Sequence, residues 1–225
     1  MRAGEEDGDK ASAALTRLCQ TYWYPLYGYV RRRGYQPEDA QDLTQEFFAR
    51  ILAKDYLKGI TREGGKFRSF LLVMLKRFLA NEWQRKNSLR RGGGREILTL
   101  NGSDSEERYR LEPPDPRSPE KAFERRCALT LLNRTVAALE KEFSNTGRSD
   151  LFAKLKPFVT GDMENNSYAE ISRQLGITEG TLRVNVNRMR KRYRALLRLE
   201  IGHTVEKPED IDDEIRNLFA ALAEP

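Results

Sequence analysis

The chain has very few of the residues that build metal and redox sites. Its 225 residues include two cysteines, Cys19 and Cys127, and one histidine, His203. Two cysteines far apart make neither a disulfide framework nor a zinc pattern, and they fit a reducing compartment. The single histidine matches no catalytic motif, and we assign it no role. We therefore expect no metal, no cofactor and no catalytic site, and hence no enzyme.

Long apolar runs, alternating strand patterns and phosphate-binding loops are also missing. The longest apolar cluster, Phe70–Leu75, is far too short to cross a bilayer. The N-terminal segment is acidic and polar, unlike a signal peptide, so a cytoplasmic protein without membrane contact is expected. Neither GITREGGK nor RRGGGR has the spacing of a phosphate-binding loop. Helical periodicity without alternation predicts an all-α fold.

Basic residues gather in two segments, although the net charge of +6 is modest. Residues 76–95 hold seven basic residues and one acidic residue, and residues 179–199 hold the same numbers. Residues 205–225 reverse this balance, with seven acidic and two basic residues. A charge run is often only a solvated helix face, but two such segments favour a polyanionic partner.

The pattern divides the chain into two small helical domains joined by a flexible linker. Residues 11–90 form the first domain, and residues 119–200 form the second. Between them, residues 91–118 are rich in glycine, proline, serine and charge, which is typical of a linker. Residues 201–225 form an acidic C-terminal extension.

Ser167–Leu199 reads as a helix–turn–helix, the layout that places an α-helix in a DNA groove. Ser167 and Glu170 predict a capping box, Gly176 permits the turn, and Thr178 is a good second N-cap. Arginines near the start of the second helix can bond guanine or phosphate, asparagine can reach adenine or phosphate, and threonines suit phosphate. The candidate residues are Thr178, Thr181, Arg183, Val184, Asn187 and Arg188. The alternative is a helical bundle with this pattern that binds no DNA.

The first domain carries two more polar surfaces. In DAQDLTQEFFARIL the polar face holds Asp39, Asp42, Gln45 and Glu46, and periodicity alone favours an ordinary solvent face. The helix that begins near Phe67 is expected to bury Phe70, Phe78 and Trp83. Its other side offers basic residues interleaved with aromatic ones, which suits single-stranded nucleic acid. These candidates are Arg68, Lys76, Arg77 and Arg85.

Three motifs in this order resemble bacterial RNA polymerase sigma factors of the sigma-70 family, extracytoplasmic-function type. PEDAQDLTQEFFARIL and FRSFLLVMLKRFLANEWQRK resemble region 2, and SYAEISRQLGITEGTLRVNVNRMRKRYR resembles the region 4 helix–turn–helix. The resemblance covers roughly Leu15–Arg90 and Pro119–Leu199. RRGGGR and TVEKPEDIDDEIRNLFAAL resemble a subgroup with a short C-terminal extension. The linker is longer than is common in the family.

The resemblance implies a promoter-specificity subunit that binds core RNA polymerase and promoter DNA without catalysis. The face with Asp39, Asp42, Gln45 and Glu46 would dock on the clamp helices of the largest subunit, and region 4 on the flap of the second. Residues 54–66 and the basic helix would capture the melted non-template strand of the −10 element. The second domain would read the −35 duplex.

Several questions stay open at this level. The promoter sequence and an anti-sigma partner are not indicated by the sequence. Two other functions also fit the same residues: a free-standing helix–turn–helix transcription regulator, and a helical interaction module without DNA specificity.

Overall fold

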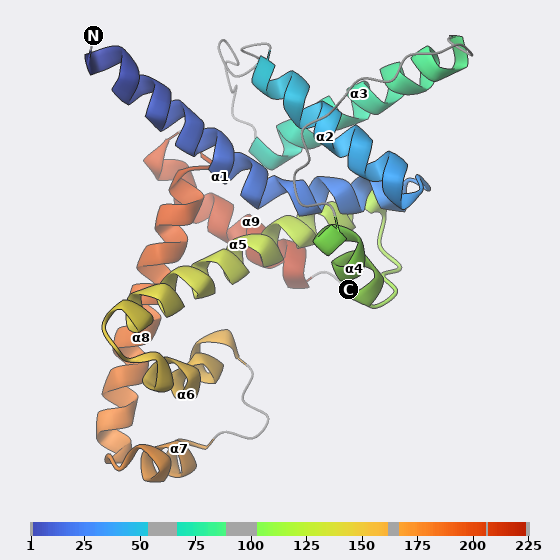
Figure 1. The fold of residues 1–225 in the computed structure, drawn as a ribbon. Helices are drawn as coiled ribbons and strands as arrows, with labels where there is room; N and C mark the ends of the chain where they lie inside the picture. The colour runs from blue at the N-terminus through green and yellow to red at the C-terminus, as the bar shows by residue number, and fades with distance from the viewer. Residues whose placement is uncertain (1, 54–66, 89–102, 162–166, 206, 224–225) are drawn as a thin grey trace. The chain divides into compact units, whose positions relative to one another are not determined.

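The computed structural model describes residues 2–53, 67–88, 103–161, 167–205 and 207–223, and these ranges contain helices and no strand. The predicted all-α class is therefore confirmed (Figure 1). The helices are α1 (Arg2–Arg32), α2 (Pro37–Ala53), α3 (Phe67–Ser88), α4 (Ser103–Leu111), α5 (Pro119–Asn145), α6 (Ser149–Thr160), α7 (Tyr168–Leu175), α8 (Glu179–Gly202), the 3-10 turn η1 (Pro208–Asp210) and α9 (Ile211–Ala223). None of these helices combines the length and apolar character of a membrane span.

The chain folds as two compact units. Unit 1 comprises residues 1–130 and 216–225, and unit 2 comprises residues 131–215. The divisions fall within α5 and α9, not within the residues that the composition marks as a linker.

Unit 1 is built on an aromatic core from α1, α2 and α3. Helix α1 passes through Pro25 without ending, and its segment 21–30 is buried. Trp23 stacks on Phe48 of α2 at a ring distance of 5.5 Å, and Phe47 meets Phe78 of α3 at 5.7 Å. Burial of several large rings per helix provides most of the drive for this packing. Helical spacing puts four apolar residues on one face of α2, and all four are buried: Ala40, Leu43, Phe47 and Ile51.

Residues 103–118 fold onto unit 1, which differs from the flexible linker predicted for residues 91–118. The hydroxyl of Tyr27 donates to Glu106 of α4, and Arg31 donates to the same carboxylate at 2.9 Å. Arg126 of α5 pairs with Glu112 through bonds of 2.6–3.0 Å. Residues 89–102 of the predicted linker lie outside the described part of the chain.

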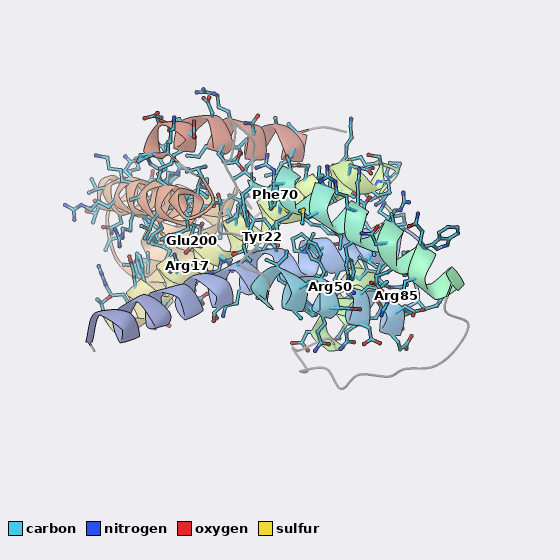
Figure 2. All side chains as sticks on the ribbon, turned by 90° about the horizontal axis from the view of Figure 1, so that it is seen from above. Arg17, Tyr22, Arg50, Phe70, Arg85 and Glu200 are labelled. Atoms are coloured by element: carbon cyan, nitrogen blue, oxygen red, sulfur yellow. The ribbon has the colours of Figure 1, made fainter. Side chains whose placement is uncertain are left out.

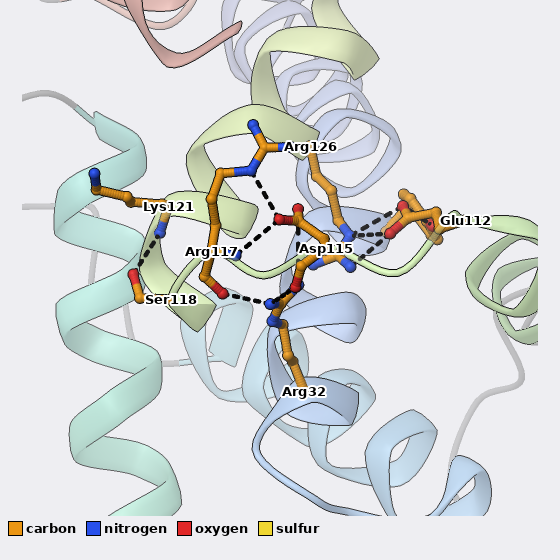
Figure 3. A network of polar contacts seen from close by, with 8 residues as sticks. Arg32, Glu112, Asp115, Arg117, Ser118, Lys121 and Arg126 are labelled. Carbon is orange, nitrogen blue, oxygen red and sulfur yellow. Dashed lines mark hydrogen bonds and ion pairs between the residues drawn. The ribbon is translucent and has the colours of Figure 1, made fainter. Parts of the chain in front are cut away.

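The chain after α4 is fastened by a second group of polar contacts (Figure 3). The guanidinium of Arg32 donates to the backbone carbonyls of Asp115 and Arg117. The carboxylate of Asp115 in turn accepts from the side chain of Arg117 at 2.8 Å. A stretch rich in proline and charge is thus ordered by specific bonds and not by an apolar core.

Unit 2 has its own core, to which the second half of α5, α6, α7 and α8 contribute. Leu139, Phe152, Phe158, Ile171 and Leu182 are each buried within it. Helical spacing puts Leu182, Val186 and Met189 on one buried face of α8, and Tyr193 is half-buried against the same cluster.

Candidate nucleic-acid interface

The helix–turn–helix forms with the local geometry that the sequence predicts. The Ser167 hydroxyl accepts from the backbone N–H of Glu170 at 3.1 Å, which caps α7. Gly176 has φ of 65°, a left-handed conformation that glycine adopts without strain. Thr178 caps α8 by accepting from the N–H of Thr181 at 3.1 Å. The carboxylate of Glu170 differs from the prediction, because its observed partners are Arg173 at 2.6 Å and the amide of Gln174.

The first turns of α8 present one exposed polar and basic face. Every candidate residue of the DNA-reading set is exposed: Thr178, Thr181, Arg183, Val184, Asn187 and Arg188. Val184 is 48% exposed, although it is apolar. Because Leu182 and Val186 anchor the opposite side in the core, this face is held at the surface of unit 2. The structure therefore brings these six candidates together on consecutive turns of one helix.

Arg183 has two neighbours that restrain it. Its guanidinium carbon lies 4.5 Å from the centre of the Tyr168 ring, a cation–π distance. One of its nitrogens lies 3.6 Å from the carboxylate of Glu179, one turn earlier. The side chain nevertheless remains 61% exposed.

Three arginines further along α8 have structural partners. Arg190 donates to the backbone carbonyl of Phe158 at 2.8 and 3.0 Å, near the end of α6. Arg192 donates to Glu142 of α5 at 2.8 Å, and its hydrogen bonds hold the pKa of Glu142 below its ordinary value. Arg198 pairs with Asp212 of the acidic extension. These three side chains already have partners within the chain, unlike the candidate residues grouped at the start of α8.

The polar face of α2 is smaller than predicted. Asp39 and Asp42 are exposed, and Glu46 pairs with Arg50 at 2.6 Å. Gln45 was expected on this face, but it is only 7% exposed. The reason is that α2 packs on both α1 and α3, so its buried arc is wider than one apolar stripe. Gln45 is therefore removed from the candidate docking residues.

Arg68 of α3 is also placed differently from the prediction. It is 2% exposed and forms an ion pair with Glu124 of α5. Because Arg68 is buried in this ion pair, it is a structural residue of unit 1. Lys76 remains 44% exposed beside Glu120 at 2.7 Å, and Arg77 is exposed.

Glu82 organises the basic side of α3 and was missed as a site residue. Its carboxylate is 5% exposed and accepts from Arg50 of α2 at 2.7 Å and from Arg85 at 2.6 Å. Figure 2 labels these two arginines, on α2 and α3. The Arg50 guanidinium also lies 4.8 Å from the centre of the Phe78 ring. The one available signal was that Glu82 is the lone acid in a basic run.

Trp83 is also placed differently from the prediction. It was predicted in the core, but it is 63% exposed. The apolar stripe of α3 ends at Leu79, and in the next turn only Glu82 is buried. Trp83 therefore lies at the surface of α3, in a turn whose other described side chains are polar and exposed apart from Glu82.

The loop predicted to cover a captured strand, residues 54–66, lies outside the described residues. Among the residues that the structure describes, no three His, Cys, Asp or Glu side chains gather as a metal site. Comparison with protein-family models, with curated proteins and with solved structures gives no match.

Proposed function

We propose that this chain is a promoter-specificity factor of bacterial RNA polymerase, a sigma factor of the extracytoplasmic-function type. The observation that carries the proposal is the exposed face on the first turns of α8, in a helix–turn–helix whose two helices are both capped at their N-termini. The order of motifs that resembles regions 2 and 4 extends the proposal from DNA binding to transcription initiation.

Helix α8 reads the −35 duplex in the major groove. Arg183 and Arg188 donate to guanine edges, Asn187 pairs with adenine, and the exposed methyls of Val184 meet a thymine methyl. Thr181 contributes a phosphate contact. The hydroxyl of Thr178 already accepts a backbone N–H, so its contribution is to fix the start of the helix.

Helix α3 holds the melted −10 strand. The phosphates are bound by Lys76, Arg77 and Arg85. The ion pair with Glu82 already restrains the side chain of Arg85 before the strand binds. The exposed ring of Trp83 gives a base a surface on which to stack. Arg68 has no part in this contact, because it is buried.

The acidic side of α2 docks on a basic surface of core polymerase. Asp39, Asp42 and Glu46 form this side, and Asp42 is the best residue to change because Glu46 also supports Arg50. Charge complementarity of this kind steers association and fixes register.

Association with core polymerase tests the proposal. We expect the full chain to bind, and D42K to weaken binding about tenfold or more, because repulsion replaces attraction. E107K changes an exposed acid of α4 and is the matched control, expected to bind as the wild type. If core polymerase is not bound while the chain alone protects a duplex site, the chain is a free-standing regulator instead. Equal binding by D42K and E107K rules out the α2 face.

A further inference from the structure

We infer that Tyr168 is a positioning residue for Arg183, and that its ring holds the guanidinium ready for a base edge. Nothing in the helix–turn–helix pattern assigns a role to Tyr168, which is the first residue of α7 and lies outside the reading helix. The inference rests on the proposed duplex-reading function of α8.

The contact crosses from one helix of the motif to the other. The Arg183 guanidinium carbon lies 4.5 Å from the Tyr168 ring centre. The carboxylate of Glu179 is 3.6 Å away, which is too long for a hydrogen bond. The ring therefore contacts the guanidinium directly, whereas Glu179 forms only a partly exposed ion pair without a hydrogen bond.

The Tyr168 ring is itself fixed by the core. It packs on the ring of Phe158 at a centre distance of 4.6 Å, and Phe158 is 2% exposed. The carbonyl of Phe158 accepts two hydrogen bonds from Arg190. Arg190 thus supports, through Phe158 and Tyr168, the position of an arginine two turns earlier on its own helix.

Stacking and base reading are compatible in a guanidinium group. A ring that contacts the flat face of the guanidinium leaves its N–H donors at the edge available. The O6 and N7 atoms of guanine accept hydrogen bonds from these donors. An unrestrained arginine would lose rotamer freedom when it binds DNA. Tyr168 removes part of that cost before binding.

The test uses the full chain with core polymerase and a duplex selected by that complex from a randomised library. Y168L removes the ring and keeps an apolar side chain, whereas Y168F keeps the ring. We expect Y168L to weaken binding about two- to fivefold and to reduce by the same factor the discrimination at the base that Arg183 reads. Y168F retains wild-type values, and Y168L in an R183A background causes no additional loss.

Y193L is the matched control, because Tyr193 is a half-buried tyrosine of the same core. It is expected to lower stability without changing base discrimination. Equal losses in Y168L and Y168F, or an undiminished effect of Y168L in R183A, would overturn the inference.

A second measurement is independent of DNA and of how well Y168L folds. Proton NMR of the Arg183 side-chain N–H, assigned with R183K, should show an upfield ring-current shift in the wild type and in Y168F. If the Arg183 N–H of the wild type has the chemical shift of a solvated arginine, the inference about Tyr168 is wrong, while the proposed function is unaffected. If the complex selects no duplex sequence, the proposed function fails, and the inference fails with it.

Discussion

The arginines of this chain differ in what their guanidinium groups contact, and this decides which of them can meet nucleic acid. Arg68 and Arg126 are buried against carboxylates, and Arg190 serves a backbone carbonyl. Arg77 and Arg188 are exposed. Buried arginines cannot exchange their partners for phosphate without a large penalty. The net basic charge therefore overstates the number of basic side chains that are exposed on the surface.

Trp83 provides a test at the level of one residue. Because its ring is 63% exposed, W83A should change the free energy of unfolding by less than about 0.5 kcal/mol. Loss of base stacking should weaken binding of a single-stranded oligonucleotide by about five- to 100-fold. Polarisation of a labelled oligonucleotide measures this, with W83F, which keeps a ring, as the control. Wild-type affinity in W83A would show that the ring does not stack on bases.

Glu106 makes unit 1 sensitive to acid. Burial by itself raises the pKa of Glu106, but hydrogen bonds from Arg31, Tyr27 and Arg110 outweigh it and lower the pKa from 4.5 to about 2. A carboxyl with a lowered folded-state pKa stabilises the fold above its unfolded pKa. This stabilisation is lost as the pH falls towards 2.

E106Q should therefore cost about 1–3 kcal/mol of unfolding free energy at pH 7. The difference from the wild type should shrink below about pH 4.5 and nearly vanish near pH 2. Urea unfolding at several pH values measures it, and E107Q, at an exposed neighbour, should show little effect. A difference that stays constant from pH 7 to pH 3 would contradict the ionic role of Glu106.

At the scale of elements, α4 is held to unit 1 by charge and hydroxyl contacts. Arg126 is 5% exposed and pairs with Glu112, which also accepts from the hydroxyl of Tyr24. Burial, the larger cause, and the hydrogen bond to Glu112 raise the pKa of Tyr24 above its ordinary value. The helix α4 therefore depends on a few polar anchors.

R126A should destabilise unit 1 by about 3–5 kcal/mol, because it leaves Glu112 without its buried partner. The amides of residues 103–111 should then lose their protection against hydrogen exchange. R110A removes an exposed ion pair of α4 and should cost about 0–1 kcal/mol. If the α4 amides of the wild type exchange as fast as unprotected amides, α4 is not packed on the rest of unit 1.

Features that depend on neighbouring residues could be predicted well from the sequence. The caps at Ser167 and Thr178, the turn at Gly176 and the apolar faces of α2 and α8 need only local geometry and periodicity. The exposed start of α8 follows from the same periodicity. The exposure of the six candidate residues was therefore predicted from the sequence, and their contact with duplex DNA stays a prediction.

Features that depend on distant packing could not be predicted. Gln45 is buried because α2 packs on both α1 and α3, and no local pattern reveals such packing. Arg68 is buried beside Glu124, which lies 56 residues away in the sequence. Trp83 shows the opposite case, since it continues the helical spacing of the apolar residues of α3 although its side chain is exposed. Residues 103–118 are ordered by tyrosines and arginines far away in the sequence.

For the whole molecule, the proposed function is divided between the two units. Unit 2 carries the exposed face that is proposed to read duplex DNA, and unit 1 carries the acidic α2 face and the basic α3 side. The proposed polymerase factor uses both units on one chain. A regulator that only binds an operator would use unit 2 alone.

The main proposal is that the chain directs core polymerase to promoters, and reconstituted transcription measures this. Core polymerase, with and without the full chain, transcribes a randomised promoter library, and the 5′ ends of the transcripts are sequenced. The account predicts starts that depend on the chain and lie at a fixed distance from two shared sequence elements. R183A with R188A should abolish dependence on the upstream element, and W83A should reduce initiation. Starts that are the same with and without the chain would contradict the account.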